Sequence, residues 1–347
     1  MYIVLLFAIL LLLVFLAFFE DEEIQSKSWL LLLIAMILTL CAAFRPEGMD
    51  KDYISYLGYY SNPNSGMALL TEPTFRVICS IARLFGVPML IFVIYAFLAI
   101  PLKMYSITQL SPFYYLSTLV WFSHLYIVQD MTQIRVAVSA ALYLFSLPFL
   151  AEGKKVKYFL IIVVAILFHY SSLFLLPIVF LDNSQLSRLK KLFLLLVPLV
   201  FYFTSIISID LLYLIPIPFI QEKIVVYEEM REYSGMFDEL NTFNIMALFR
   251  LFVYYLLLWK YDVVVKSYKY APLLIKIFCY SICVYSGLSF FPVFAVRAQE
   301  LIGTIDFIAI PLLVFTIRPI WFGRLAVIIY VVGVFIADLF LYDYFKF

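Results

Sequence analysis

The stretch YFLIIVVAILFHYSSLFLLPIVFL, residues 158–181, decides how the chain is threaded. It is apolar almost throughout, but His169, Tyr170, Ser171 and Ser172 interrupt it near the middle. The segment is therefore one membrane span or a tight hairpin, and each hairpin arm would be about 11 residues, or roughly 16 Å of helix. Such an arm does not cross about 30 Å of hydrocarbon. A hairpin turn would line a cavity inside the protein, or the helices would be strongly tilted in a locally thinned bilayer.

The composition places the whole chain in a membrane. Of its 347 residues, 66% are hydrophobic and 14% are charged, and the mean hydropathy is +1.05. Ordinary soluble domains are about half apolar and about a quarter charged, so a soluble protein is excluded. The apolar runs are long and do not alternate in polarity, which indicates helices rather than barrel strands. They lie at about residues 2–19, 29–44, 87–105, 111–128, 132–151, 158–168, 171–181, 192–209, 244–259, 271–291, 301–317 and 325–342.

We therefore predict an all-α polytopic membrane protein with about 11–12 transmembrane or half-membrane helices. The chain reads as a single integral membrane domain, residues 1–347, with outer loops at about 45–73 and 210–243. Residues 2–19 are interpreted as a retained first span, because no basic region precedes them. Lys and Arg total 24 against 23 for Asp and Glu, with no polybasic stretch, so no nucleic acid partner is expected.

The distribution of positive charge favours the hairpin. Lys154, Lys155 and Lys157 form the clearest cytoplasmic anchor, because cytoplasmic loops hold the excess of Lys and Arg. If the chain turns back at His169, nine later cations fall inside and five outside, and a single span reverses that split. The nine are Arg188, Lys190, Lys191, Lys260, Lys266, Lys269, Lys276, Arg318 and Arg324, and the five are Lys223, Arg231, Arg250, Arg297 and Lys346.

The first outer loop carries charged and aromatic residues close together. FRPEGMDKDYISYLGYY, from Phe44, contains Arg45, Asp50 and Asp52, followed by Tyr53, Tyr56 and Tyr60 on one helical face. The spacing of the two aspartates resembles a site for a metal with a diphosphate, but helix-start carboxylates show the same pattern. The tyrosines suit stacking on sugar rings or an interfacial belt. No metal is assigned here.

Two further polar groups are predicted on the same side of the membrane. Glu72 and Pro73 begin an amphipathic helix, where Glu72 also suits a helix-dipole partner. Gln133 and Arg135 open the span that follows the next turn. A guanidinium offers bidentate donors to a phosphate oxygen, although an interfacial Arg can also snorkel to head groups.

His169 is the candidate general base, because an imidazole there can take a proton from a sugar hydroxyl or donate to a phosphate. A lone histidine at a helix break also suits a cap or a packing residue. The other histidine, His124, is interpreted as structural. Arg250 lies within an apolar span, and Arg297 precedes Glu300 by three residues. No GxSxG, P-loop, CxxC or HExxH motif occurs, so serine hydrolases, nucleotide-driven pumps and zinc proteases lack support.

In their order along the chain and in the residues that neighbour them, these residues resemble the EpsG-type branch of the Wzy polysaccharide polymerases, the O-antigen and capsule polymerases of bacteria. The resemblance covers about residues 44–315 through short elements. These are Arg45 with Asp50, Asp52 and Tyr53; Glu72-Pro73; Gln133-Ile134-Arg135; Phe168-His169-Tyr170-Ser171; and Arg297. Arg250, Asp306 and the loop at 210–243 are not carried over by it.

The resemblance implies a glycosyltransferase with a GT-C-like membrane fold and an outer-face cavity, in the bacterial cytoplasmic (inner) membrane and facing the periplasm or exterior. Its substrate would be undecaprenyl diphosphate-linked oligosaccharide. The glycan of one carrier would pass to a repeat unit on another, with no cofactor. Membrane lipid is the other expected partner, and a chain-length regulator is a partner to be tested.

For this activity the predicted site contains a catalytic base, diphosphate-binding residues and sugar-binding residues. His169 is the catalytic base, with Glu72 and Asp52 as alternatives. The donor diphosphate is held by Arg135 and Arg297, supported by Arg45 and Arg250. Sugar contacts are assigned to Gln133, Asp50, Tyr53, Tyr56 and Tyr170.

Two other classes stay open on the sequence. A lipid-linked-oligosaccharide flippase or transporter would need a basic intramembrane cavity, but such folds bring internal repeats and none is visible. A membrane O-acyltransferase would also use a membrane histidine, but it would need an acyl-donor route from the cytoplasm.

The charge distribution makes a topological prediction. Ser187 is expected in the cytoplasm and Ser234 outside, because the chain turns back at His169. Single cysteines at these two positions, with the native cysteines removed, would be treated from outside with an impermeant thiol reagent. Reaction at 234 and not at 187 is expected, and the reverse pattern would refute the hairpin topology.

Overall fold

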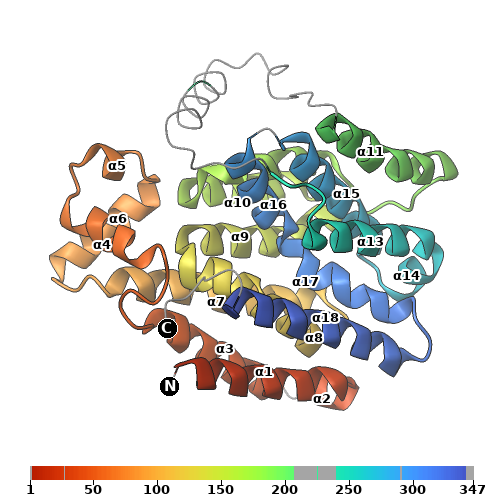
Figure 1. Cartoon of the computed structure of the whole chain (residues 1–347), viewed down its shortest axis with the longest axis horizontal. Coiled ribbons are helices and arrows are strands. Elements are labelled where there is room, and N and C mark those ends of the chain that lie inside the picture. Colours follow the sequence, from red (N-terminus) through yellow and green to blue (C-terminus); the bar gives the residue numbers. More distant parts are fainter. Residues whose placement is uncertain (1, 27, 207–224, 226–239, 290, 341–347) are drawn as a thin grey trace. The chain divides into compact units, whose positions relative to one another are not determined.

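The computed structural model describes residues 2–26, 28–206, 225, 240–289 and 291–340 (Figure 1). In this part of the chain every regular element is a helix and no strand occurs, so the predicted all-α class is confirmed. Most of the predicted loop at 210–243, with Lys223, Arg231 and Ser234, lies outside the described residues, as does Lys346.

Five helical stretches are long and apolar enough to cross a membrane. They are Leu90–Leu110, Ile134–Ala151, Arg188–Ile206, Pro292–Phe315 and Ile320–Phe340. Shorter apolar helices accompany them, including Tyr2–Phe18 and Ala271–Gly287. Together they give a polytopic membrane protein. The GT-C-like resemblance and the outer-face position of a cavity stay predictions.

The chain divides into two compact units, Met1–Phe180 with Asp306–Phe347, and Leu181–Ile305. The first contains α1 (Tyr2–Phe18), α2 (Glu22–Ser26), α3 (Ser28–Ala43), α4 (Tyr53–Ser61), α5 (Gly66–Leu69), α6 (Pro73–Leu84), α7 (Leu90–Leu110), α8 (Tyr114–Ser123), the π-helix η1 (Tyr126–Thr132), α9 (Ile134–Ala151), α10 (Lys155–Phe168), the 3₁₀ helix η2 (Tyr170–Phe180), α17 (Asp306–Ala309), the 3₁₀ helix η5 (Ile310–Phe315) and α18 (Ile320–Phe340). The single-domain assignment stays a prediction.

The centre of the first unit is the row α3, α7, α9 and α10, each packed on the next. Small residues of α9, Ala137, Ala140 and Ala141, are fully or nearly fully buried, which lets the neighbouring backbones approach closely. Ser139 of α9 donates to the Ala165 carbonyl of α10 at 2.9 Å, so a polar bond also joins these two helices. This row provides the scaffold for the site.

The chain turns back at His169, as the hairpin interpretation predicted. His169 leaves the helical conformation, with φ −156° and ψ 121°, and η2 then packs along α10. The Tyr158 hydroxyl at the start of α10 donates to the Leu175 carbonyl of η2 at 2.8 Å. In a continuous helix these two residues would be about 25 Å apart. The turn places the residues around His169 at one end of the row.

Three short helices, α4, α5 and α6, form a layer beside one end of α7 (Figure 1). Pro73 occupies the first turn of α6, as predicted, because its missing N–H is not needed there. The apolar face of α6, made of Phe75, Ile78, Cys79 and Ala82, is buried. Its opposite face is exposed, so the amphipathic pattern in the sequence positions Glu72 at the edge of the core.

The turn expected between the apolar runs 111–128 and 132–151 is a helical segment in the structure. The π-helix η1 continues to Thr132, and only Gln133 interrupts the path into α9. Lys103 of α7 donates to Asp130 at 2.7 Å and to Gln129 at 3.0 Å, and all three are buried. A buried charge is stable only with a partner, so this ion pair holds η1 inside the core.

The second unit contains α11 (Arg188–Ile206), α13 (Ile245–Trp259), α14 (Tyr261–Ser267), α15 (Ala271–Gly287), α16 (Pro292–Ile302) and the 3₁₀ turn η4 (Gly303–Ile305). The helix α15 packs against α11, α13 and α16. Lys276 of α15 binds the Asp182 carboxylate at 2.5 Å and the carbonyls of Asp182 and Ser184. This lysine therefore anchors the segment that precedes α11.

Candidate functional site

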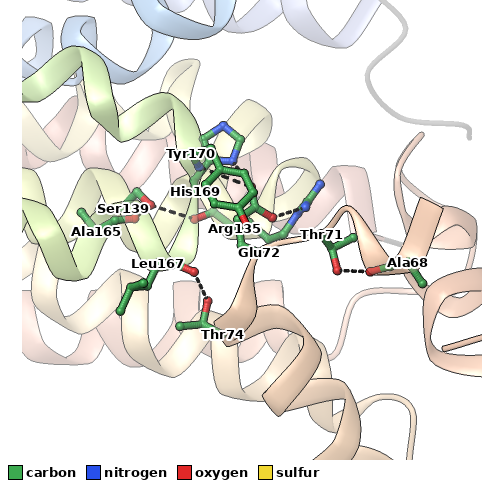
Figure 2. A network of polar contacts seen from close by, with 10 residues as sticks. All are labelled: Ala68, Thr71, Glu72, Thr74, Arg135, Ser139, Ala165, Leu167, His169 and Tyr170. Atoms are coloured by element: carbon green, nitrogen blue, oxygen red, sulfur yellow. Dashed lines mark hydrogen bonds and ion pairs between the residues drawn. The ribbon is translucent and has the colours of Figure 1, made fainter. Parts of the chain in front are cut away.

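One carboxylate joins the two strongest candidates of the sequence. Glu72 lies at the start of α6, and Figure 2 shows it between Arg135 and His169. Its Oε2 accepts a hydrogen bond from the Arg135 guanidinium, and its Oε1 lies 3.0 Å from His169 Nδ1. The backbone N–H of Tyr170 also points to Oε1, at 3.4 Å. Three predicted site residues, from α6, α9 and the hairpin turn, are thereby brought together.

The electrostatics of this cluster keep Glu72 ionised. Burial alone would raise the pKa of Glu72, but the hydrogen bond from His169 and the charge of Arg135 outweigh it and lower the pKa to about 2. The side chain is 4% exposed, against 11% for His169 and 23% for Arg135. Of the three, the guanidinium is therefore the group most open to a ligand.

The contact with Glu72 also fixes the form of the imidazole. An ionised carboxylate only accepts hydrogen bonds, so His169 Nδ1 carries the proton in this contact. In the neutral ring the lone pair is then on Nε2. A carboxylate that accepts from Nδ1 fixes the tautomer and the orientation of the ring, as it does for metal-binding histidines. Glu72 therefore orients the His169 ring, whose Nε2 atom is buried.

Aromatic residues hold the Arg135 guanidinium from another side. Its central carbon lies 5.4 Å from the Phe75 ring centre and 5.8 Å from that of Tyr56. A guanidinium over a ring is attracted by the negative ring face and keeps its orientation. Thr74 donates to the Leu167 carbonyl at 2.6 Å, which joins the start of α6 to the end of α10. The cluster is thus braced from both helices.

Two residues predicted to contact sugar lie next to the cluster. Tyr170 is 47% exposed, so its ring is accessible directly beside Glu72. Gln133 is half-buried at the break before α9, two residues from Arg135. Their sugar-binding roles stay predictions that this placement permits.

The first outer loop uses its charges internally. Arg45 Nε donates to Asp50 Oδ2 at 2.7 Å, and both side chains are completely buried. Arg45 also lies over the Phe92 ring at 4.4 Å. Asp50 in turn accepts from the backbone N–H of Asp52, the residue before α4. The roles predicted for Arg45, Asp50 and Asp52 in substrate binding or catalysis stay predictions, and the geometry indicates that the first two stabilise the loop.

Tyr53 and Tyr56 lie in the hydrophobic core rather than on the surface. They are 5% and 3% exposed, and the Tyr53 ring stacks on Phe92 at 4.4 Å. Their spacing along the helix reflects packing against α6 and α7. Their predicted sugar contacts stay predictions, which the burial of the two rings does not support.

The other two predicted arginines belong to the second unit. Arg250 of α13 is buried, donates to Ser281 at 2.9 Å and lies over the Phe278 ring at 5.4 Å. A Cβ on Gly303 would come within 2.9 Å of its guanidinium, so a larger residue there would require this end of the arginine to shift. Arg297 is exposed on α16. Their diphosphate-binding roles stay predictions.

Several polar partners were not found from the sequence. For His124, which the sequence indicates to be structural, the structure adds a partner, because its Nδ1 lies 2.6 Å from Asp338 of α18. The Lys103–Asp130 pair was also missed. The sequence offered one signal for each pair. Asp338 is the one acidic residue in the apolar run 325–342, and Lys103 is the one lysine in the run 87–105.

Comparison with protein families matches residues 28–346 to the EpsG family, which is nearly the whole chain. The chain belongs to the EpsG family. It is accordingly a multi-pass bacterial membrane protein, a glycosyltransferase-type polymerase of polysaccharide biosynthesis. No curated protein and no solved structure matches the chain significantly.

The bridging position of Glu72 predicts the effect of Glu72→Gln. Removing one partner from a buried ion pair costs about 3–5 kcal/mol, so the variant should unfold at a lower temperature and make much less polysaccharide. Thermal unfolding in detergent and polymer yield would be measured beside Glu47→Gln, an exposed glutamate of the same loop. Equal stability and yield in the two variants would refute the bridging role.

The stability difference between wild type and Glu72→Gln depends on pH, because folding lowers the pKa of Glu72. The pKa of Glu72 falls from 4.5 to about 2 on folding, so its stabilisation is complete above about pH 5 and is lost as pH falls from 4.5 toward 2. The stability gap between wild type and Glu72→Gln, measured by thermal unfolding, should therefore narrow as pH falls from 4.5 toward 2.

Proposed function

We propose that this protein polymerises a polysaccharide from undecaprenyl diphosphate-linked repeat units at the outer face of the bacterial cytoplasmic membrane. The donor is the growing glycan on its lipid diphosphate, and the acceptor is one repeat unit on the same carrier. The observation that carries the proposal is the single carboxylate, Glu72, that holds a base and a cation together. Family membership supports the polymerase class.

In this mechanism His169 Nε2 takes the proton of an acceptor sugar hydroxyl. The hydroxyl oxygen attacks the anomeric carbon of the donor sugar, and the bond from that carbon to the diphosphate oxygen breaks. The bonding electron pair leaves with undecaprenyl diphosphate. Glu72 keeps the imidazole in the required tautomer and balances the charge of the protonated ring. It is a positioning residue in this scheme.

Arg135 stabilises the negative charge that develops on the leaving diphosphate. Its guanidinium is accessible on one side and braced on the other by Phe75. It also lies in the first turn of α9, where the helix dipole adds a partial positive charge. A fixed cation at a developing anion costs no reorganisation during the reaction. The diphosphate-binding roles of Arg297 and Arg250, expected from the sequence, stay proposals.

Purified protein incubated with the lipid-linked repeat unit should give a ladder of longer chains. A general base contributes about 10²–10⁴-fold, so His169→Ala should lower turnover by that order while the protein stays folded. Arg135→Lys and Arg297→Lys keep the charge but lose the planar fork, and both should impair transfer. The matched control for the lysine variants is Arg76→Lys on the exposed face of α6.

The appearance of longer chains distinguishes the proposed polymerase from a transporter and from an acyltransferase. Normal ladders from His169→Ala and both lysine variants would show that the site is placed wrongly. Movement of the intact lipid-linked unit without chain growth would identify a transporter, and transfer of an acyl group an acyltransferase.

Metal dependence is a separate prediction. The Asp50 carboxylate is already bound to Arg45, so the two aspartates are expected to stabilise the loop rather than hold a metal with the diphosphate. Polymerisation should therefore continue undiminished in EDTA. Loss of the ladder in chelator, with recovery on adding Mg²⁺ or Mn²⁺, would contradict this assignment.

A further inference from the structure

The layer of α4, α5 and α6 contains a hollow that is lined by none of the predicted site residues. It lies between the end of α4 and α5 and has a volume of about 600 Å³. Small-molecule sites commonly have volumes of about 300–1,000 Å³. Its lining includes Ser55, Tyr59, Ser61, Asn62, Asn64 and Ser65. None of the residues that line it is charged.

We propose that this hollow is a subsite for a neutral sugar ring of the lipid-linked glycan, next to the centre where the new bond is made. The proposal rests on the proposed function for the identity of the substrate. It assigns to residues 55–65 a part in recognising the repeat unit, separate from the chemistry at Glu72.

The lining matches the chemistry of a sugar ring. A neutral sugar offers hydroxyls that both donate and accept, and serine hydroxyls and asparagine amides do the same. It also presents C–H faces that pack on an aromatic ring, which Tyr59 supplies at the edge of the hollow. Tyrosine with serine and asparagine is the combination that gives rigid contact area and adaptable hydrogen bonds. A diphosphate would require cations, and a lipid tail would require an apolar lining.

The hollow connects to the site through two aromatic contacts. Tyr59 packs edge-to-face on Phe75, with ring centres 6.0 Å apart. Phe75 in turn carries the Arg135 guanidinium at 5.4 Å. Along the chain, α5 leads through Thr71, which donates to the Ala68 carbonyl, directly to Glu72 (Figure 2). A glycan whose diphosphate lies at Arg135 can therefore extend toward the hollow.

Local bonds hold the hollow in shape. Ser65 accepts from the Ala68 N–H at 3.2 Å and caps α5, and Arg83 of α6 donates to the Tyr60 carbonyl at 3.1 Å. These contacts fix both walls before a ligand arrives, which reduces the entropy lost on binding. Asn62 and Asn64 are exposed on the loop between the walls. Their amides are the groups that a sugar would meet first.

The test uses the full-length protein in nanodiscs and the oligosaccharide released from its carrier by mild acid. Binding of this lipid-free probe would be followed by ligand-observed NMR titration. Losing one hydrogen bond weakens binding roughly 2- to 10-fold, so Asn62→Ala with Asn64→Ala should weaken it about 10-fold or more. Tyr59→Ala should do the same. Gln109→Ala, an exposed amide on α7, and Tyr105→Ala, an exposed tyrosine of the same helix that does not line the hollow, are the controls.

The same variants would be compared in the polymerisation assay. The double asparagine variant changes exposed residues only, so it should fold normally, raise KM for the lipid-linked unit and leave kcat near the wild-type value. Wild-type affinity for the probe and unchanged KM in both hollow variants would overturn the subsite while the polymerase stands. Weakened probe binding in a protein that makes no ladder would support the subsite and refute the polymerase.

Discussion

The site depends on one carboxylate that makes two contacts: Glu72 accepts a hydrogen bond from Arg135 and another from His169. A carboxylate that is 4% exposed is costly unless its charge is compensated, and these two partners supply the compensation. Each partner comes from a different helical element, and each has a second contact that fixes it: Phe75 for Arg135, and the hairpin turn for His169. The carboxylate is the group that links the cation directly to the imidazole.

Much of this arrangement was predictable, because lipid imposes strict rules on a chain. Backbone groups must be bonded internally, so the apolar runs became helices, and the short arms on either side of His169 became a hairpin. Pro73 marked the start of α6. The sequence predicted three site residues that lie together in the fold: Glu72, Arg135 and His169. Only the fold shows that they contact one another.

What the sequence did not show are the pairings across helices. Lys103 and Asp130 are 27 positions apart, and His124 and Asp338 are 214 apart, so no local pattern relates them. The tyrosines of α4 gave a clear helical period, but a period does not say which face meets the core. Tyr53 and Tyr56 face inward, and Tyr59, on another side of the same helix, lines the hollow.

The separation of the three residues along the chain has a consequence for biogenesis. Glu72 leaves the ribosome 63 residues before Arg135 and 97 before His169. The Glu72 carboxylate therefore has neither of these two partners until the later segments have been synthesised. The contacts that join the layer of α4, α5 and α6 to α9 and to the hairpin turn can form only after those segments exist. A translation product that stops before His169 would leave the carboxylate without its imidazole partner, although the layer could still pack on α7.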